Sequence, residues 1–280
     1  MVRRSASGIA LQITKEDNVM ASVTKRIEEI KQPYGGYIPL SKFKKIQLND
    51  GKTLFDSENI HASVSGMAVD YMTRLVMGAD ADDAFYISLK GAKRASLLGQ
   101  ENSAKIADKL LSGIKGIDDK SIISACKLST FDVWARNPAA APMAKTADEI
   151  NPDKNTILNI QTMVERSVDF WKEYGPITAD GFTFEYDGYT PTVNSGDGDF
   201  LTYDTMWDFK VSKSKPTSKN TLQLLMYWIM GQHSGKEEFR GIKNIGIFNA
   251  RLNMVYILQI SEVSSEIIKE VERDVICYEN

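Results

Sequence analysis

Residues 196–227 read GDGDFLTYDTMWDFKVSKSKPTSKNTLQLLMY, and they are the most informative part of the chain. Asp199 and Asp208 lie on two expected neighbouring strands, each flanked by bulky apolar residues. Lys210 follows Asp208 by two residues, so both side chains leave the same face of their strand. An ionised acid in apolar surroundings needs a counter-charge or a metal. Two acids and one ammonium at one point therefore predict a site for a hard divalent cation.

The flanking sequence predicts an α/β core. Period-two alternation and turn residues indicate strands over 182–186, 199–203, 206–211, 243–249 and 254–260. The second and third strands have a short link and are expected to form an antiparallel hairpin. A helix from Pro216 to Gly231 follows the third strand, and an amphipathic helix over 261–275 ends the chain.

The part of the chain before residue 176 has a helical pattern. Helices are expected over 15–31, 59–77, 103–114 and 155–174, with Gly78 as a helix cap and a loop over 137–144. We therefore divide the chain into an N-terminal segment, a mainly helical region and an α/β core, with bounds 1–58, 59–175 and 176–280.

Composition narrows the class of protein. The 280 residues are 42% apolar and 25% charged, with a formal net charge of -3. This is ordinary globular composition, so any nucleic-acid-binding surface must be local. Cys126 and Cys277 cannot build a four-cysteine metal site and give no disulfide framework, so a reducing cytoplasm is the expected location. No apolar run reaches membrane-spanning length, so no membrane partner is expected.

Gln223 and Tyr227 are four residues apart and share one face of the expected 216–231 helix. The rest of that helix is almost wholly apolar and is expected to pack against the sheet. Two polar side chains in such a helix need polar partners, and an active site at its edge would supply them.

Three pieces of this stretch resemble the PD-(D/E)XK nuclease superfamily, and within it the RecB-like branch. They are Gly196 to Asp199, the Asp-Phe-Lys run at 208–210, and Gln223 to Tyr227. The resemblance implies a restriction-endonuclease-like mixed sheet flanked by helices. It also implies Asp199 and Asp208 as ligands of Mg²⁺ or Mn²⁺, Lys210 as the catalytic lysine, and Gln223 and Tyr227 as organisers of the site.

The RecB-like branch also has an upstream Gly-x-x-x-His motif whose histidine binds metal. Residues 65–71 read SGMAVDY, with Asp70 at the position of the histidine. Aspartate is a good ligand for a hard metal, so Asp70 is the preferred third ligand. Glu165 is the competing candidate, because other members of the superfamily use a glutamate in the helix before the strands. Asp70 could instead form an ion pair with Arg74, four residues later.

A lysine-rich loop follows Lys210. Lys213, Lys215 and Lys219 are expected either to contact phosphates at the mouth of the site or to lie in a solvated loop. Arg251 is expected in a structural turn, although it could also contact a phosphate. His61 and His233 fit no nucleophile or zinc pattern and are expected to be structural.

The leading hypothesis is a Mg²⁺- or Mn²⁺-dependent nuclease that hydrolyses phosphodiesters, with DNA favoured over RNA by family analogy alone. A role in bacterial or phage DNA processing or defence is compatible with it. The alternative is a catalytically inactive nuclease-fold module that binds nucleic acid or serves a helicase or other protein partner. A sugar-phosphate or nucleotide hydrolase with the same metal site is a third, weaker option.

Overall fold

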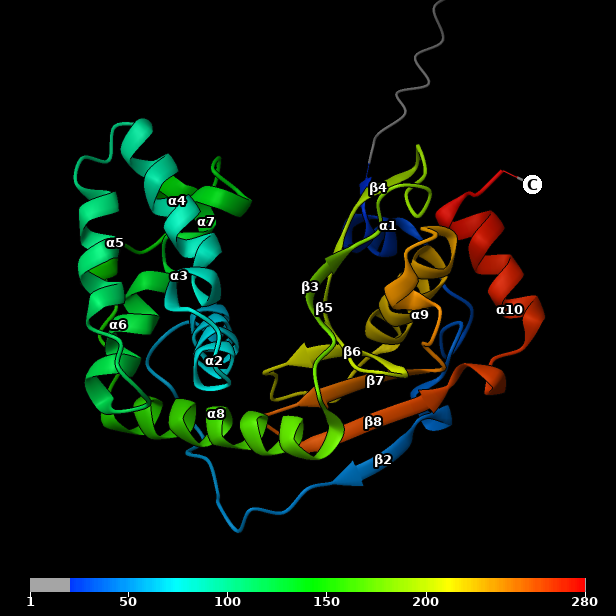
Figure 1. The fold of residues 1–280 in the computed structure, drawn as a ribbon, viewed down its shortest axis with the longest axis horizontal. Helices are drawn as coiled ribbons and strands as arrows, with labels where there is room; N and C mark the ends of the chain where they lie inside the picture. Colours follow the sequence, from blue (N-terminus) through cyan, green and yellow to red (C-terminus); the bar gives the residue numbers. More distant parts are fainter. Residues whose placement is uncertain (1–20, 280) are drawn as a thin grey trace, which may run out of the picture.

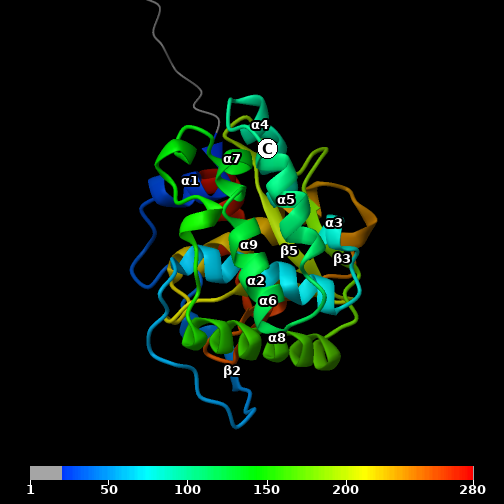
Figure 2. The same cartoon turned by 90° about the vertical axis from the view of Figure 1, so that its left-hand side faces the viewer.

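A computed structural model describes residues 21–279 of the chain. A helical lobe and a β-sheet lobe face one another, and the long helix α8 (Lys154–Tyr174) runs beneath both (Figure 1). Figure 2 views the helical lobe face-on, with α8 across its base. This arrangement places α2 (Ala62–Val76), the helix that carries Asp70, opposite the strands that carry Asp199 and Asp208.

The sheet is mixed and six-stranded, in the order β2-β8-β7-β6-β5-β3. Its β6–β7 pair is parallel, and its other pairs are antiparallel. The strands are β2 (Lys44–Gln47), β3 (Ala179–Thr183), β5 (Asp197–Leu201), β6 (Thr205–Lys210), β7 (Asn244–Asn249) and β8 (Met254–Gln259). A separate parallel pair joins β1 (Ala21–Ser22) to β4 (Val193–Ser195).

Helices cover the two faces of the sheet. The helical lobe comprises α2 (Ala62–Val76), α3 (Ala81–Ala84), α4 (Tyr86–Leu97), α5 (Ser103–Ser112), α6 (Asp119–Ser129) and α7 (Asp132–Arg136). The outer side of the sheet carries α1 (Val23–Glu29), α9 (Ser218–His233) and α10 (Ser265–Glu270), which continues as a π-helical turn, Val271–Ile276. Short 3₁₀ turns lie at Leu40–Lys42, Ala141–Met143, Ala147–Glu149, Glu237–Phe239 and Ile260–Glu262.

Alternation along β6 separates two cores. Trp207 belongs to the core shared with α8, where Phe170 stacks on Phe248 with ring centroids 4.0 Å apart. Met206 belongs to the opposite core, which α9 fills. By the period of two, Asp208 and Lys210 lie on the same face as Met206. The acids and the lysine therefore belong to the side of the sheet that faces α9.

The fold class is confirmed as mixed α/β with helices on both sides of the sheet. The expected β5–β6 hairpin, the helical region before residue 175 and the two later strands are present. The sheet also takes its edge strand β2 from residues 44–47, outside the expected 176–280 core. The short, lysine-bearing β2 has no long alternating pattern that would reveal a strand.

Several expected boundaries are wrong. The strand predicted over 182–186 is β3 (Ala179–Thr183), which ends earlier because its pairing with β5 ends at Thr183. Phe182 and Phe184 are both buried. The helix predicted from Pro216 begins at Ser218, because Asn220 accepts a hydrogen bond from the backbone N–H of Thr217 at 2.8 Å and caps it there. Of the helix predicted over 15–31, the described part is α1; residues 15–20 lie outside the described residues.

Helix α4 approaches the start of α7 closely at Gly91, so a substitution at Gly91 tests the packing of the helical lobe. A Cβ at Gly91 would lie 1.9 Å from the carbonyl oxygen of Phe131, which as backbone cannot rotate away. We expect Gly91→Ala to lower the free energy of unfolding by about 1–3 kcal/mol. Gly116→Ala is the control, since nothing lies within 4 Å of its Cβ position. Urea denaturation of both variants measures the difference, and equal stabilities would contradict the packing.

Candidate active site

The strands β5 and β6 separate at the point where the two motif acids lie. Their ladder has two pairs, Phe200 with Trp207 and Leu201 with Met206. The next opposed positions would be Asp199 and Asp208. Here the Asp199 side chain replaces the backbone ladder: its Oδ2 accepts a 2.7 Å hydrogen bond from the backbone N–H of Phe209. The splayed strand ends thus bring both carboxyl groups to one place.

Asp208 and Lys210 form a direct ion pair. Lys210 Nζ lies 2.7 Å from Asp208 Oδ1. The Asp208 residue is 3% exposed, and the Lys210 side chain is 30% exposed. The second oxygen, Asp208 Oδ2, is buried and has no hydrogen-bond partner among residues 21–279. A buried carboxylate oxygen without a donor costs free energy, so this atom has capacity for a cation.

The site holds more negative charge than it neutralises. Burial and the neighbouring Asp208 charge raise the pKa of Asp199 to about 7, against the opposing effect of Lys210, and Asp70 raises it further. Burial also raises the pKa of Asp208, even though Lys210 lowers it. Burial alone would lower the pKa of Lys210, but the two carboxylates outweigh it and raise that pKa. Lys210 therefore remains an ammonium, and the two acids lack a second cation.

Gln223 and Tyr227 of α9 lie beside these acids. Gln223 Nε2 donates a 3.0 Å hydrogen bond to Tyr227 Oη. Burial raises the pKa of Tyr227, and the charges of Asp208 and Asp199 raise it further. A Cβ at Gly196 would lie in ordinary contact with this ring, 3.5 Å from Tyr227 Cε1, but only 2.9 Å from Val23 Cγ2 of α1. Gly196 therefore allows α1 to pack closely beside the tyrosine.

Asp70 reaches the site from α2, across from the sheet. Its charge acts on Asp199. Its Oδ1 also accepts a 3.0 Å hydrogen bond from Arg74 Nε, so the ion pair considered as the alternative for Asp70 is present. Arg74 pairs in addition with Asp180 of β3 and lies 4.6 Å from the Phe200 ring centroid. A metal bound by Asp70 would share this carboxylate with Arg74.

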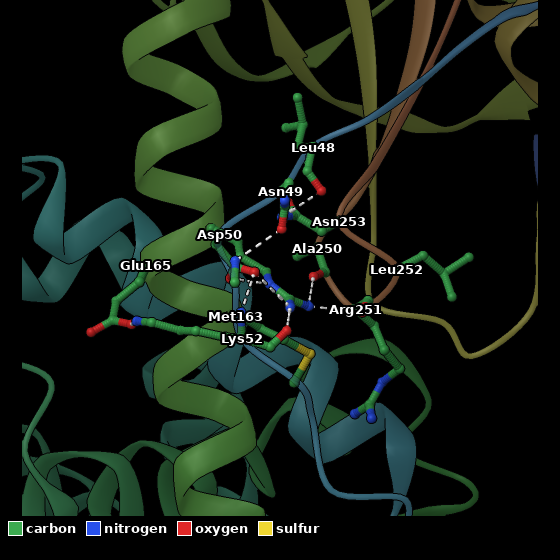
Figure 3. Close-up of polar contacts among 12 residues, drawn as sticks. Leu48, Asn49, Asp50, Lys52, Met163, Glu165, Ala250, Arg251, Leu252 and Asn253 are labelled. Carbon is green, nitrogen blue, oxygen red and sulfur yellow. Dashed lines mark hydrogen bonds and ion pairs between the residues drawn. The ribbon is translucent and has the colours of Figure 1, made fainter.

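Glu165 is engaged elsewhere. Its side chain is 41% exposed and pairs with Lys52. Figure 3 shows this pair on α8, with the Glu165 carboxylate directed away from Asp50 and the 250–253 turn. Of the two candidates for a third ligand, Asp70 is therefore the one that lies beside the acids.

Lys213 and Lys215 are exposed in the loop between β6 and α9. Lys219, expected in the same loop, is exposed in the first turn of α9 instead. Lys213 Nζ donates a 2.6 Å hydrogen bond to the carbonyl of Asp56. His61 accepts a hydrogen bond at the N-terminus of α2, and His233 stacks on Tyr278. Both histidines thus have structural contacts.

Sequence reasoning misses three polar residues around the site: Asp180, Glu58 and Asn249. Asn249 is 1% exposed and lies beside Lys210 on the parallel neighbour β7. Its Nδ2 donates a 2.9 Å hydrogen bond to the carbonyl of Ser212 and so fixes the start of the lysine loop. A single asparagine closing an apolar strand is the only sequence signal for it.

The described residues contain no group of three or more His, Cys, Asp or Glu side chains placed to hold a metal ion. Mg²⁺ commonly uses one or two protein carboxylates and completes its shell with water and substrate phosphate. Asp199 and Asp208, with the buried Oδ2 of Asp208 that has no hydrogen-bond partner among residues 21–279, fit this smaller requirement. No helix within residues 21–279 has the length and apolarity to span a membrane.

Comparisons give no relative for this chain. No family model matches it, and no curated protein or solved structure matches it either.

The raised pKa of Asp199 predicts a pH-dependent stability. In the folded chain this carboxyl keeps a proton up to about pH 7, whereas its ordinary pKa is 3.8. Without metal, the folded state should therefore lose stability as the pH rises from about 4 to about 7. Asp199→Asn should increase the free energy of unfolding by about 1–3 kcal/mol at about pH 8 and change it little at about pH 4. Urea denaturation in EDTA measures both; a gain of the same size at both pH values would contradict this electrostatic cause.

The placement of Asp70 and Glu165 predicts different effects on metal binding. We expect Asp70→Asn to weaken Mn²⁺ binding about tenfold, because it removes a negative charge beside Asp199. Glu165→Gln should leave it within about twofold, because charges outside the site are screened by solvent. Calorimetric titration of the two variants with Mn²⁺ decides between them. A larger loss of Mn²⁺ affinity in Glu165→Gln than in Asp70→Asn would instead identify Glu165 as the third ligand.

Proposed function

We propose that this protein is a metal-dependent nuclease that hydrolyses phosphodiester bonds, with DNA as the favoured substrate. The observation that carries the proposal is the buried pair Asp199 and Asp208, with the orphan Asp208 Oδ2 and Lys210 beside it. A divalent cation would offset the unpaired negative charge, and a phosphodiester would complete its coordination.

The order of the motif elements along the fold supports a restriction-endonuclease-like core. The acids lie on an antiparallel hairpin, β5–β6, and the glutamine and tyrosine lie on the next helix, α9. The β6 strand then pairs in parallel with β7. The order of strand, strand and helix, and the mixed sheet, are what the resemblance to the PD-(D/E)XK superfamily implies.

Each residue of the site has a separable role in hydrolysis. Bound Mg²⁺ or Mn²⁺ would polarise the phosphodiester and lower the pKa of a water. Asp199 and Asp208 would hold the cation at the splayed strand ends. Lys210 keeps its proton, because both acids raise its pKa; it is therefore suited to stabilise negative charge on the phosphate oxygens and not to remove a proton. Gln223 orients Tyr227 at the rim through their hydrogen bond.

Loss of the ammonium should separate catalysis from metal binding. Lys210→Met retains an apolar side chain of similar length without the charge, and we expect it to cut DNA at least about 100-fold more slowly. It should bind Mn²⁺ no more weakly than the wild type, because a competing cation has been removed. Lys243→Met is the control, since Lys243 is exposed and precedes β7 at the end of the sheet distant from Lys210.

The assay is degradation of plasmid and linear DNA in Mg²⁺, Mn²⁺ or EDTA, with free nucleotides as a second substrate. Equal cutting by the wild type and Lys210→Met would remove Lys210 from catalysis. Intact DNA with normal metal binding by the wild type would favour the non-catalytic nuclease-fold module. Hydrolysis of nucleotides alone would favour the nucleotide hydrolase.

A further inference from the structure

A cavity of about 500 Å³ opens where β6 ends, beyond Lys210, and where α2 begins. Val211, the residue after Lys210, forms one wall, and Ala62 and Ser63 of α2 form another. Ser212 and Ser214 add hydroxyl groups, and Lys213 and Arg251 add positive charge. Cations and hydroxyls around an open cavity are suited to a phosphate oxygen.

Arg251 is the buried anchor of this cavity. Its side chain is 7% exposed and pairs with Glu58, which is 6% exposed. Glu58 also accepts hydrogen bonds from Ser65 at 2.9 Å and Asn159 at 3.0 Å, so its position is fixed. Within residues 21–279, Glu58 is the one acceptor of the Arg251 guanidinium. The remaining N–H groups of the guanidinium are thus left for a ligand.

The backbone around the cavity is also fixed. Asn249 donates a hydrogen bond to the carbonyl of Ser212 and accepts one at 3.1 Å from the backbone N–H of Arg251. It therefore ties the loop after β6 to the turn after β7. In Figure 3 the Arg251 side chain runs away from Asp50 and Lys52. Its guanidinium pairs with Glu58, which also lines the cavity.

We propose that this cavity binds a phosphodiester group of the substrate strand near, but not next to, the phosphodiester at Asp199, Asp208 and Lys210. The proposal rests on the proposed nuclease function for the identity of its substrate. Lys213, Arg251 and Glu58 give the lining a net charge of +1, which matches one phosphodiester. The N-terminus of α2 adds a partial positive charge.

The spacing along α2 fits this assignment. Ser63 lines the cavity, and Asp70 lies beside the acids. At 1.5 Å per residue these positions are ~10 Å apart along the helix, a distance that more than one nucleotide of a strand would span. Between them, a Cβ at Gly66 would lie 3.9 Å from Val211 Cβ, so α2 contacts the end of β6 there.

A charge-balanced double variant tests the cavity. Glu58→Gln with Arg251→Gln removes one charge of each sign, so the net charge of the protein and its general attraction for DNA stay the same. We expect it to bind a fluorescein-labelled DNA oligonucleotide about tenfold more weakly in EDTA, by anisotropy. The slope of log K against log salt should fall by about 0.7 for single-stranded DNA, as for one lost phosphate contact.

Single-charge variants give a second comparison. Lys213→Gln should weaken binding by a similar factor, whereas Lys243→Gln, with the same net charge, should stay within about twofold. If the double variant fails to fold, Ser63→Asp replaces it. This substitution places a carboxylate at the cavity mouth and favours the α2 N-terminus, so binding should fall while the melting temperature does not.

Failure of this inference differs from failure of the proposed function. Wild-type DNA affinity in the double variant, or equal losses of affinity in Lys213→Gln and Lys243→Gln, would refute the phosphodiester site in the cavity. The cleavage assay would still test the nuclease proposal separately. No DNA binding by the wild type would overturn it as well. Tight wild-type binding that is lost in the cavity variants, with no cutting in Mg²⁺ or Mn²⁺, would support the cavity and refute the nuclease.

Discussion

The hydrogen bond from the Phe209 N–H to the Asp199 carboxyl holds β5 and β6 together where their ladder has ended. A side chain here does the work of a backbone carbonyl, and this brings Asp199 beside Asp208. Two acids in low-dielectric surroundings repel, and one ammonium from Lys210 balances only part of their charge. A divalent cation would offset this repulsion. The same two carboxylates therefore lower the stability of the fold at this point and provide the proposed metal site.

The site draws on parts of the chain that are distant in sequence. Helix α2 of the helical lobe brings Asp70 toward the acids, and its Arg74 pairs with Asp180 of β3. Buried Arg166 of α8 binds Asp50 at 2.6 Å and the carbonyl of Arg251 at 3.0 Å. This second network joins the N-terminal segment, α8 and the β7–β8 turn (Figure 3). The lobes are therefore held by charged contacts as well as by the core that α8 shares with the sheet.

Arg74 is the point where these contacts compete. The guanidinium that joins the helical lobe to β3 also binds Asp70, the candidate third ligand. A cation between Asp70 and Asp199 would compete with Arg74 for the same carboxylate. Metal binding would thus be linked to the contact between the lobes through the Arg74 side chain. Glu165 has no such conflict, because its partner is Lys52 on the outside of α8.

The sequence alone determined the local features. A two-residue step put Asp208 and Lys210 on one strand face, a four-residue step put Gln223 next to Tyr227, and the short link predicted an antiparallel hairpin. These follow from fixed periods of strand and helix. Tertiary structure decided the edge strand β2, the choice of Asp70 over Glu165 as the neighbour of the acids, and the pairing of Arg251 with Glu58. Such contacts join residues across the chain, where no local period applies and only packing of the whole chain sets the distance.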